Sequence, residues 1–518
     1  MTQAFSKQVV FRSVLMVTGS TYVNYASGLL VSTLIARSLG PADYGRYSYL
    51  VWLCGVLIIF FTNGLTTSGI RFVSECLGRG DPGVAEDVHG WLQKGYYASL
   101  AIVTLAFCAC VRWLEPAGWA GHLWVFAAIA LISAVAKAHY LFRVSIAKGY
   151  GLFGMDAATT SMMSILGLLG TVALAVAGAS LNAYVLLFAA VSLGHAIVAQ
   201  VLSRRARIHP RHEAVDQVLA RRIRQHLWWT IVLTMVGALT NKSLETFLLN
   251  KWAGPEAVGF FLIAAALTRG GIDLLCSGLN SVLMSAMSHA FGVGGIERVN
   301  RILIDALRYF VFLGLLLAGV GVLWANSVIA IMYGAKFSQA AFVLQMMVLV
   351  GGLTLVEGAF GAVLSTTDNQ KARVAASVLY VVVTAVTAFS LVPVYGLMGA
   401  IWAHVLSRSI VTLAIAIGTT RMLRIRLPYA EIARLLGAAA CGALAALPVL
   451  LVSSNLVAQF IAGIVYATAY AGSSVLLRAW HQRDLQLIGS VATRIPMLRA
   501  ILQRLERWMR APAADTPP

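Results

Sequence analysis

Apolar runs of roughly 20 residues recur from one end of the 518-residue sequence to the other. A run of this length, wound as an α-helix, crosses the ~30 Å hydrocarbon core of a bilayer. Helices are required because a chain in lipid must satisfy its own backbone hydrogen bonds. Charged residues make up 11% of the chain, against about 25% in soluble domains. The sequence therefore predicts an all-α integral membrane protein without a separate soluble domain.

The apolar runs are separated by glycine, proline and charged residues, which set where each helix is expected to end. Together they predict about fourteen transmembrane helices, at 13–36, 46–70, 94–112, 122–146, 157–178, 182–202, 226–250, 257–290, 302–325, 338–364, 372–392, 396–420, 429–451 and 455–477.

Lysine and arginine are distributed unevenly between the two sides of this helix pattern. With the N-terminus inside, about 31 of the 39 basic residues fall on the cytoplasmic side. That excess follows the positive-inside rule, so both termini are predicted to be cytoplasmic. The net charge of +19 lies in these short basic runs. Because the runs lack the aromatic–basic interleaving of RNA-binding proteins, no nucleic-acid partner is expected.

The expected organisation has five parts: a six-helix lobe at 1–202, a basic cytoplasmic loop at 203–225, a second six-helix lobe at 226–420, an extra helix pair at 421–478, and a tail at 479–518. Apolar residues of the tail recur at helical spacing, with arginines on its other faces. This pattern favours a basic amphipathic segment on the anionic cytoplasmic membrane surface. A solvated basic tail is the alternative.

A short motif is repeated at the first connection of each lobe. Gly40-Pro41 is followed by Gly45, and Gly254-Pro255 by Gly259, at an offset of 214 positions, with an acidic residue in between. The first glycine ends a helix, proline blocks its continuation, and the second glycine allows close helix packing. Two parallel six-helix repeats predict a pseudo-two-fold axis along the membrane normal. A substrate site is then expected between the halves, as in transporters.

The segment from Arg37 to Tyr47 resembles the first-loop signature of bacterial polysaccharide flippases, in the multidrug/oligosaccharidyl-lipid/polysaccharide exporter superfamily. Residues 331–337 and 393–400 are similar to short outer connections of that family. The resemblance covers roughly 11–423 plus the extra helix pair. It implies a protein of the bacterial inner membrane that moves a polyprenyl-diphosphate-linked repeat unit to the outer leaflet. Many relatives have an acidic–basic pair where this chain has Asn241-Lys242, so no acidic role carries over to Asn241.

Basic residues within the apolar runs are candidates for substrate binding, because charges at the membrane midplane cost about 2.5–3.5 kcal/mol and are usually functional. Such a cationic patch would attract a diphosphate. Two local alternatives are neutralisation of Arg269 by Asp273 and of Lys242 by Glu245. For the cations of the fourth helix the alternative is snorkelling to the membrane boundary. The six candidates are Arg269, Arg408, Lys242, Lys137, Arg143 and Arg71.

Two acids in the apolar runs are candidates for ion coupling. Glu357 has no base nearby in the sequence, and Asp273 is the second candidate. Burial raises the pKa of a carboxyl group, so either could titrate during a transport cycle. The alternative for Glu357 is a partner on another helix, for which Arg408 is available.

Catalytic and metal-binding motifs are absent from the sequence, and the six cysteines and ten histidines show no ligand spacing. We therefore expect no enzyme activity and no cofactor. The predicted function is a flippase for surface polysaccharide synthesis that works by alternating access. Its expected partners are the lipid-linked oligosaccharide, membrane lipids and a glycan polymerase or other assembly protein, and a monomer suffices. Alternatives are a multidrug cation antiporter, a peptidoglycan-precursor flippase, a glycan polymerase or ligase, and an assembly scaffold.

Overall fold

The structure is a computed structural model that describes residues 7–480 apart from 120, 241–242, 368, 426 and 454. Every regular element in that part of the chain is helical. Eleven of its helices are long and apolar enough to cross a membrane. The prediction of an all-α, multi-pass fold is confirmed. Lys242 and nearly all of the tail predicted at 479–518 lie outside the described residues.

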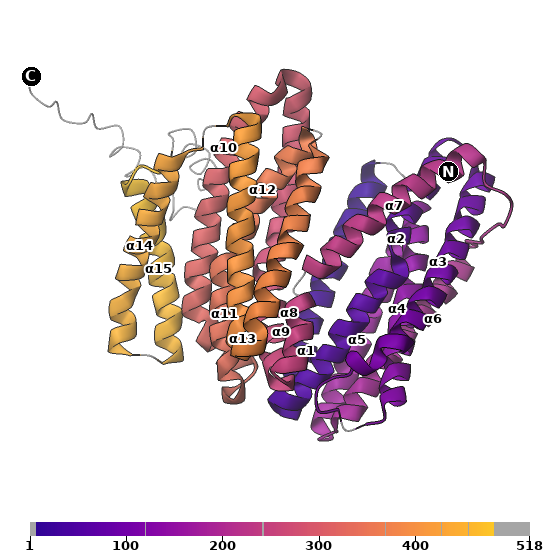
Figure 1. The fold of residues 1–518 in the computed structure, drawn as a ribbon, viewed down its shortest axis with the longest axis horizontal. Coiled ribbons are helices and arrows are strands. Elements are labelled where there is room, and N and C mark those ends of the chain that lie inside the picture. The colour runs from indigo at the N-terminus through magenta and orange to yellow at the C-terminus, as the bar shows by residue number, and fades with distance from the viewer. Residues whose placement is uncertain are drawn as a thin grey trace, which may run out of the picture.

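The chain folds into two helical lobes and a terminal helix pair (Figure 1). The first lobe contains α1 (Lys7–Thr62), α2 (Leu65–Gly78), α3 (Pro82–Cys110), η1 (Val111–Trp113), α4 (Leu123–Gly149), α5 (Gly154–Val176) and α6 (Leu181–Arg205). The second contains α7 (Gln217–Thr240), α8 (Ser243–Trp252), α9 (Pro255–Thr268), η2 (Arg269–Asp273), α10 (Leu274–Met332), η3 (Ala335–Phe337), α11 (Ser338–Gly351), α12 (Leu353–Thr366) and α13 (Gln370–Leu423). The pair is α14 (Tyr429–Val452) and α15 (Leu456–Leu476).

Three of these helices are far longer than one bilayer crossing. The 59 residues of α10 would span about 88 Å if straight. Instead each long helix contains a glycine with positive φ: Gly40 in α1 (77°), Gly295 in α10 (60°) and Gly396 in α13 (54°). Residues with a Cβ rarely adopt this backbone region, so glycine permits the chain to turn back there.

The two copies of the repeated turn pack against each other. A Cβ on Gly45 would lie 1.8 Å from the carbonyl oxygen of Pro255, and a Cβ on Gly259 would lie 3.2 Å from the carbonyl oxygen of Pro41. Gly45 corresponds to Gly259 and Pro41 to Pro255 through the 214-residue offset. The contact is therefore reciprocal, as the pseudo-two-fold relation of the repeats requires. We call this side of the molecule the turn end, and the opposite side, where α1 begins, the basic end.

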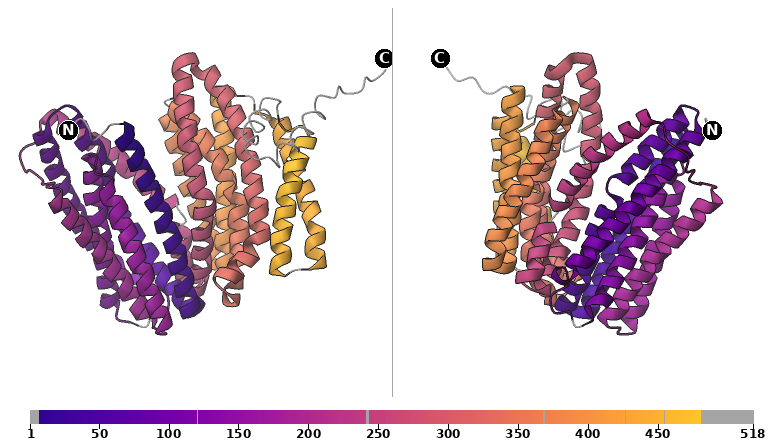
Figure 2. Two further views of the ribbon diagram at one scale, coloured as in Figure 1. Left: turned by 180° about the vertical axis from the view of Figure 1, so that it is seen from behind. Right: turned by 45° about the vertical axis from the view of Figure 1, so that its right-hand side comes forward.

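Further contacts between the lobes also lie near the turn end. They are polar contacts that join residues far apart in the sequence: Arg37 Nε to the Met332 carbonyl (2.8 Å), Ser32 Oγ to Tyr333 Oη (3.2 Å) and Asn250 Nδ2 to the Glu115 carbonyl (2.9 Å). From there the ribbons of the two lobes diverge toward the basic end in all three views (Figures 1 and 2).

The terminal helix pair is fixed to the flank of the second lobe. Tyr466 and Tyr470 of α15 donate hydrogen bonds to the α10 carbonyls of Leu315 (2.9 Å) and Phe312 (3.1 Å). The Tyr466 ring lies over Gly319, where a Cβ would come within 2.0 Å of it. The pair therefore extends the second lobe away from the interface between the lobes (Figure 1).

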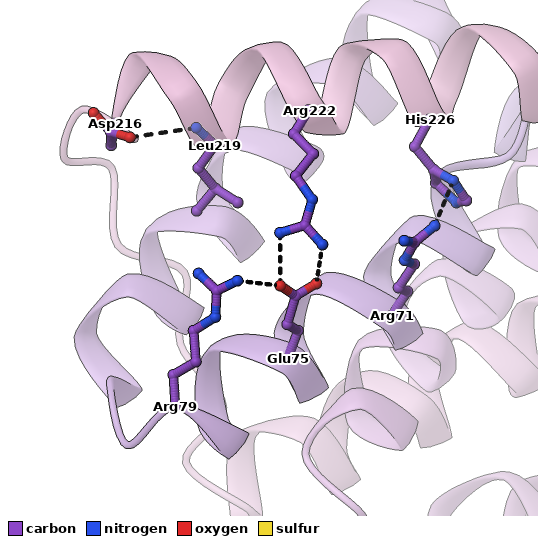
Figure 3. Close-up of polar contacts among 7 residues, drawn as sticks. All are labelled: Arg71, Glu75, Arg79, Asp216, Leu219, Arg222 and His226. Carbon is purple, nitrogen blue, oxygen red and sulfur yellow. Dashed lines mark hydrogen bonds and ion pairs between the residues drawn. The ribbon is translucent and has the colours of Figure 1, made fainter.

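Helix α7 links the two lobes at the basic end. It begins at Gln217, within the segment expected to be a loop, and its first half lies along α2 of the first lobe (Figure 3). Arg222 holds Glu75 through two hydrogen bonds of 2.6 and 3.0 Å, and Arg79 adds a third of 2.5 Å. The hydrogen bond from Arg222 lowers the pKa of Glu75. This carboxylate is therefore ionised at neutral pH and fastens α7 to α2.

We predict that Gly45→Val destabilises the protein, because its side chain would overlap the Pro255 carbonyl. Overpacking of this kind costs about 1–3 kcal/mol. A lower thermal unfolding midpoint in detergent would show this. Gly55→Val is the matched control, since a Cβ at Gly55 meets nothing within 4 Å. Equal midpoints for the two variants would contradict the close contact between the turns.

We predict that Glu75→Gln frees the first half of α7 while leaving global stability nearly unchanged, because exposed ion pairs contribute only about 0–1 kcal/mol each. Hydrogen exchange of peptides from 217–226 should become faster at pH 7. Because the pKa of Glu75 is lowered on folding, wild-type protein should lose this protection as pH falls through that lowered value. The control Glu297→Gln, at an exposed position of α10, should change neither the exchange rate of peptides from 217–226 nor its dependence on pH. Unchanged α7 exchange in Glu75→Gln would refute the fastening role.

Candidate functional site

A pocket of about 680 Å³ lies within the second lobe. This volume is typical of small-molecule sites, which range over about 300–1,000 Å³. Helical spacing places its lining residues on single faces of α12 and α13, as shown by the i, i+4 and i, i+7 relations of Arg373, Ser377 and Tyr380. The polar lining residues are Asn280, Thr354, Glu357, Ser365, Arg373, Ser377, Tyr380 and Arg408.

Glu357 and Arg408 form an ion pair inside this pocket. Arg408 Nη1 lies 2.6 Å from Glu357 Oε2, and Thr412 Oγ1 lies 2.5 Å from Glu357 Oε1. The guanidinium also sits 5.3 Å from the centre of the Tyr380 ring. The predicted alternative for Glu357, a partner on another helix, is thus what the structure shows. Arg408 is a compensated cation, with Asp273 also within electrostatic reach.

Arg269 occupies a different position, on the π-helical turn η2 between α9 and α10. Its side chain is exposed, and it forms no ion pair with Asp273 within the described structure. Tyr25 of the first lobe packs on the neighbouring Gly270 and donates to the Ala266 carbonyl at 3.2 Å. Arg269 therefore lies beside the junction of the two lobes. π-Helical turns interrupt regular hydrogen bonding and often occur at functional sites.

Two predicted cations of the first lobe lie on α4. Lys137 is the 15th of 27 residues in that helix, so it lies near the middle of α4. Its Nζ lies 3.0 Å from Nε2 of His195 on α6. Arg143, farther toward the basic end, donates from Nε to His139 at 2.9 Å. Lys137 lines a second pocket of about 140 Å³, whereas Arg143 does not.

Arg71 lies on α2 at the basic end, where its guanidinium contacts Nδ1 of His226 on α7 at 2.9 Å (Figure 3). Its side chain is exposed and lines neither pocket. The structure thus distributes the predicted cations over several places: Arg408 in the second lobe, Arg269 at the junction, Lys137 and Arg143 in the first lobe, and Arg71 in the link between α2 and α7.

Several site residues were absent from the sequence predictions, notably His195, Tyr380 and Thr412. His195 carries a usable signal, because it is a histidine at the centre of an otherwise apolar helix. Tyr380 and Thr412 resemble ordinary membrane-helix residues, and only the packing of α12 against α13 brings them to Glu357. Within the described residues, no group of three His, Cys, Asp or Glu side chains could hold a metal ion.

Comparison with solved structures places this fold among known transporters. The lipid II flippase MurJ, in an inward closed conformation, aligns with a TM-score of 0.71 at 14% identity, over 91% of this chain and 99% of MurJ. An inward-facing multidrug resistance MATE transporter of the MOP superfamily aligns with 0.60 at 14%, over 78% and 94%. A MOP superfamily transporter from Pyrococcus furiosus, described as having a binding pocket of reverse polarity, aligns with 0.52 at 16%, over 80% and 95%. At these identities the similarity shows the fold.

Sequence comparison identifies the family. The search of curated protein sequences gives no match. The family model for polysaccharide biosynthesis proteins matches residues 10–291, which is more than half of the chain and includes nearly all of the first lobe. The chain therefore belongs to the polysaccharide biosynthesis protein family, and it has the two-lobed helical fold of the MOP transporters.

Proposed function

We propose that this protein is a flippase that carries polyprenyl-diphosphate-linked oligosaccharide units from the cytoplasmic to the outer leaflet of a bacterial inner membrane, for surface polysaccharide synthesis. The observation that carries the proposal is a transporter fold in a chain of the polysaccharide biosynthesis family. The 680 Å³ pocket, with its hydroxyl, amide and guanidinium groups, has the size and polarity to receive sugar. No chemical step on the substrate is part of this proposal.

The two main alternatives are a multidrug cation antiporter and a peptidoglycan-precursor flippase. The MATE alignment covers 78% of this chain, whereas the MurJ alignment covers 91%. A cation antiporter would also require acids to face its substrate, whereas Glu357 is paired with Arg408. These observations favour a flippase. Lipid II remains the competing substrate, because MurJ shares the fold.

We propose fourteen crossings with both termini in the cytoplasm. Two of the eleven candidate spans are kinked at Gly40 and Gly396, and each is long enough for two crossings. The α7–α8 segment supplies the last crossing. The basic residues then place the basic end in the cytoplasm and the turn end outside. In this orientation the lobes are joined on the outer side, which corresponds to an inward-facing state.

In the proposed cycle, the diphosphate head group enters between the lobes from the basic end while the polyprenyl chain stays in lipid. Arg269, exposed beside the lobe junction, offers its guanidinium to the diphosphate. Lys242 immediately precedes α8 and is proposed to assist, and Arg408, Lys137, Arg143 and Arg71 are weaker candidates because each has a partner in the structure. Rocking of the lobes about the turns would then expose the head group outside. A monomer contains both lobes, and a glycan polymerase would consume the product.

The proposal predicts that Arg269→Ala slows translocation about 10- to 100-fold, since hydrogen bonds to charged groups contribute about 1.5–3 kcal/mol. The assay uses proteoliposomes with a fluorescent polyprenyl-diphosphate glycan and measures its exposure in the opposite leaflet. Arg421→Ala, which removes an exposed arginine near the end of α13, is the matched control and should retain the wild-type rate.

Three other outcomes of this assay are informative. Unchanged translocation in Arg269→Ala would overturn the role of Arg269 while leaving the flippase intact. Movement of lipid II but of no other glycan lipid would favour the peptidoglycan-precursor reading. Absence of glycan translocation together with cation efflux would replace the flippase by an antiporter.

We further propose that Glu357 couples transport to an ion gradient, with Asp273 as the second candidate. Neutralising the carboxylate would release Arg408 and Thr412, which both contact it. Wild-type translocation should rise when a proton or sodium gradient is imposed, and Glu357→Gln should remove that stimulation. Removing one partner of a buried ion pair costs about 3–5 kcal/mol, because the other charge is left unpaired. The double variant Glu357→Gln/Arg408→Gln removes both charges, so it separates loss of coupling from the effect of an unpaired Arg408. Stimulation that survives in Glu357→Gln would exclude coupling at this site.

A further inference from the structure

The 140 Å³ pocket of the first lobe has a polar end at mid-depth. It is lined by α1, α4, α5 and α6. Ser27 lies 13 residues from the turn at Gly40, Lys137 lies 14 from the start of α4, and His195 lies 14 from the start of α6. At 1.5 Å per residue these side chains share a level about 20 Å from the turn end. These three polar groups therefore lie at mid-depth of the first lobe.

Lys137 is paired there with a neutral acceptor. His195 Nδ1 lies 2.8 Å from the Val191 carbonyl, and because a carbonyl can only accept, Nδ1 carries the proton. Nε2 of the neutral ring is then free to accept from Lys137 Nζ at 3.0 Å. The hydrogen bond orients the ammonium group but does not compensate its charge.

The acid of α5, Asp156, is already satisfied. Asp156 accepts from Lys148 and Tyr140, each at 2.5 Å, and from Thr160 at 3.2 Å. Among the described residues, none of the carboxylates lies within ion-pair distance of Lys137. One positive charge is thus left in the interior of the lobe. An unpaired charge at this depth costs free energy, so we expect a bound anion to stabilise the charged form of Lys137.

The rest of the pocket also offers donors. Ser164 Oγ donates to Asn24 Oδ1 at 2.9 Å, and the Asn24 side-chain amide adds two N–H donors to the lining. The hydroxyl of Tyr184, farther along the same face of α6, is buried and has no hydrogen-bond partner within the described structure. The lining contains no acidic side chain. An ammonium, an amide and hydroxyl groups form a lining that favours anions over cations.

We propose that this pocket binds a small oxyanion of the phosphate class, with Lys137 as its counter-charge. At about 30 Å³ per water molecule, 140 Å³ holds roughly four or five waters. That is room for one phosphate group but not for an oligosaccharide. The phosphate comes either from solution or from the diphosphate of a prenyl lipid. The site is separate from the Glu357–Arg408 pocket, and the proposal holds whether or not the chain is a flippase.

The test uses the full-length protein in detergent, with inorganic phosphate as the probe and sodium chloride at matched ionic strength as the reference. Phosphate should raise the thermal unfolding midpoint in a saturable way, as a ligand of the native state does. Lys137→Met should weaken phosphate binding at least tenfold. Lys251→Met, which removes an exposed lysine at the turn end, should bind like wild type. No saturable effect on wild type, or an unchanged one in Lys137→Met, overturns the site.

A second variant keeps the test decisive if Lys137→Met does not fold. Ser27→Asp adds a carboxylate to the lining, so it should stabilise the protein without phosphate and abolish the phosphate effect. A full phosphate response in Ser27→Asp contradicts the proposal. Farnesyl diphosphate then identifies the source, because displacement of phosphate assigns the pocket to a prenyl diphosphate and independence assigns it to the free ion. Since the readout is binding, a failed translocation assay leaves this result unaffected.

Discussion

The close contact between the two Gly-Pro turns is the constraint on which the rest of the structure depends. Without a hydrophobic driving force between helices in lipid, association depends on close packing, and small residues permit it. Gly45 and Gly259 bring backbone against backbone across the pseudo-two-fold axis. The repeats are thereby joined at the turn end, and the long helices carry them apart toward the basic end (Figure 2). Glycines line this contact, which suits a pivot between the two lobes.

The lobes share an architecture but treat their buried cations differently. In the second lobe, Arg408 is held by Glu357 in a large pocket. In the first lobe, Lys137 is held by a neutral histidine in a small one. The first arrangement favours a carboxylate whose protonation changes local contacts, and the second favours an anion. We infer that duplication supplied two equivalent bundles whose interiors then acquired distinct electrostatic roles.

Apolar run length predicted the helical fold, and the repeated turn predicted which segments are equivalent. Both depend on local chemistry that a sequence displays directly. Depth along a helix was also accessible for Arg408, which was predicted to be an intramembrane charge, whereas Lys137 was predicted either to bind substrate or to snorkel to the membrane boundary. The Glu357–Arg408 pair was one of the alternatives that the sequence left open. The partner of Lys137 was not found, because His195 is 58 residues away in the chain and on another helix. The first half of α7, inside the basic segment, is fastened by the Glu75–Arg222 contact, which is tertiary and leaves little trace in composition.

Spin-label distances between the lobes test the pivot most directly. In a cysteine-depleted background, one label pair at Asp81 and Glu297 reports the basic end, and another at Trp113 and Tyr395 reports the turn end. Addition of a polyprenyl-diphosphate glycan should shorten the first distance and lengthen the second in the same population. Distances that stay constant, or that change in the same direction, would contradict a rocking motion about the Gly45–Gly259 contact.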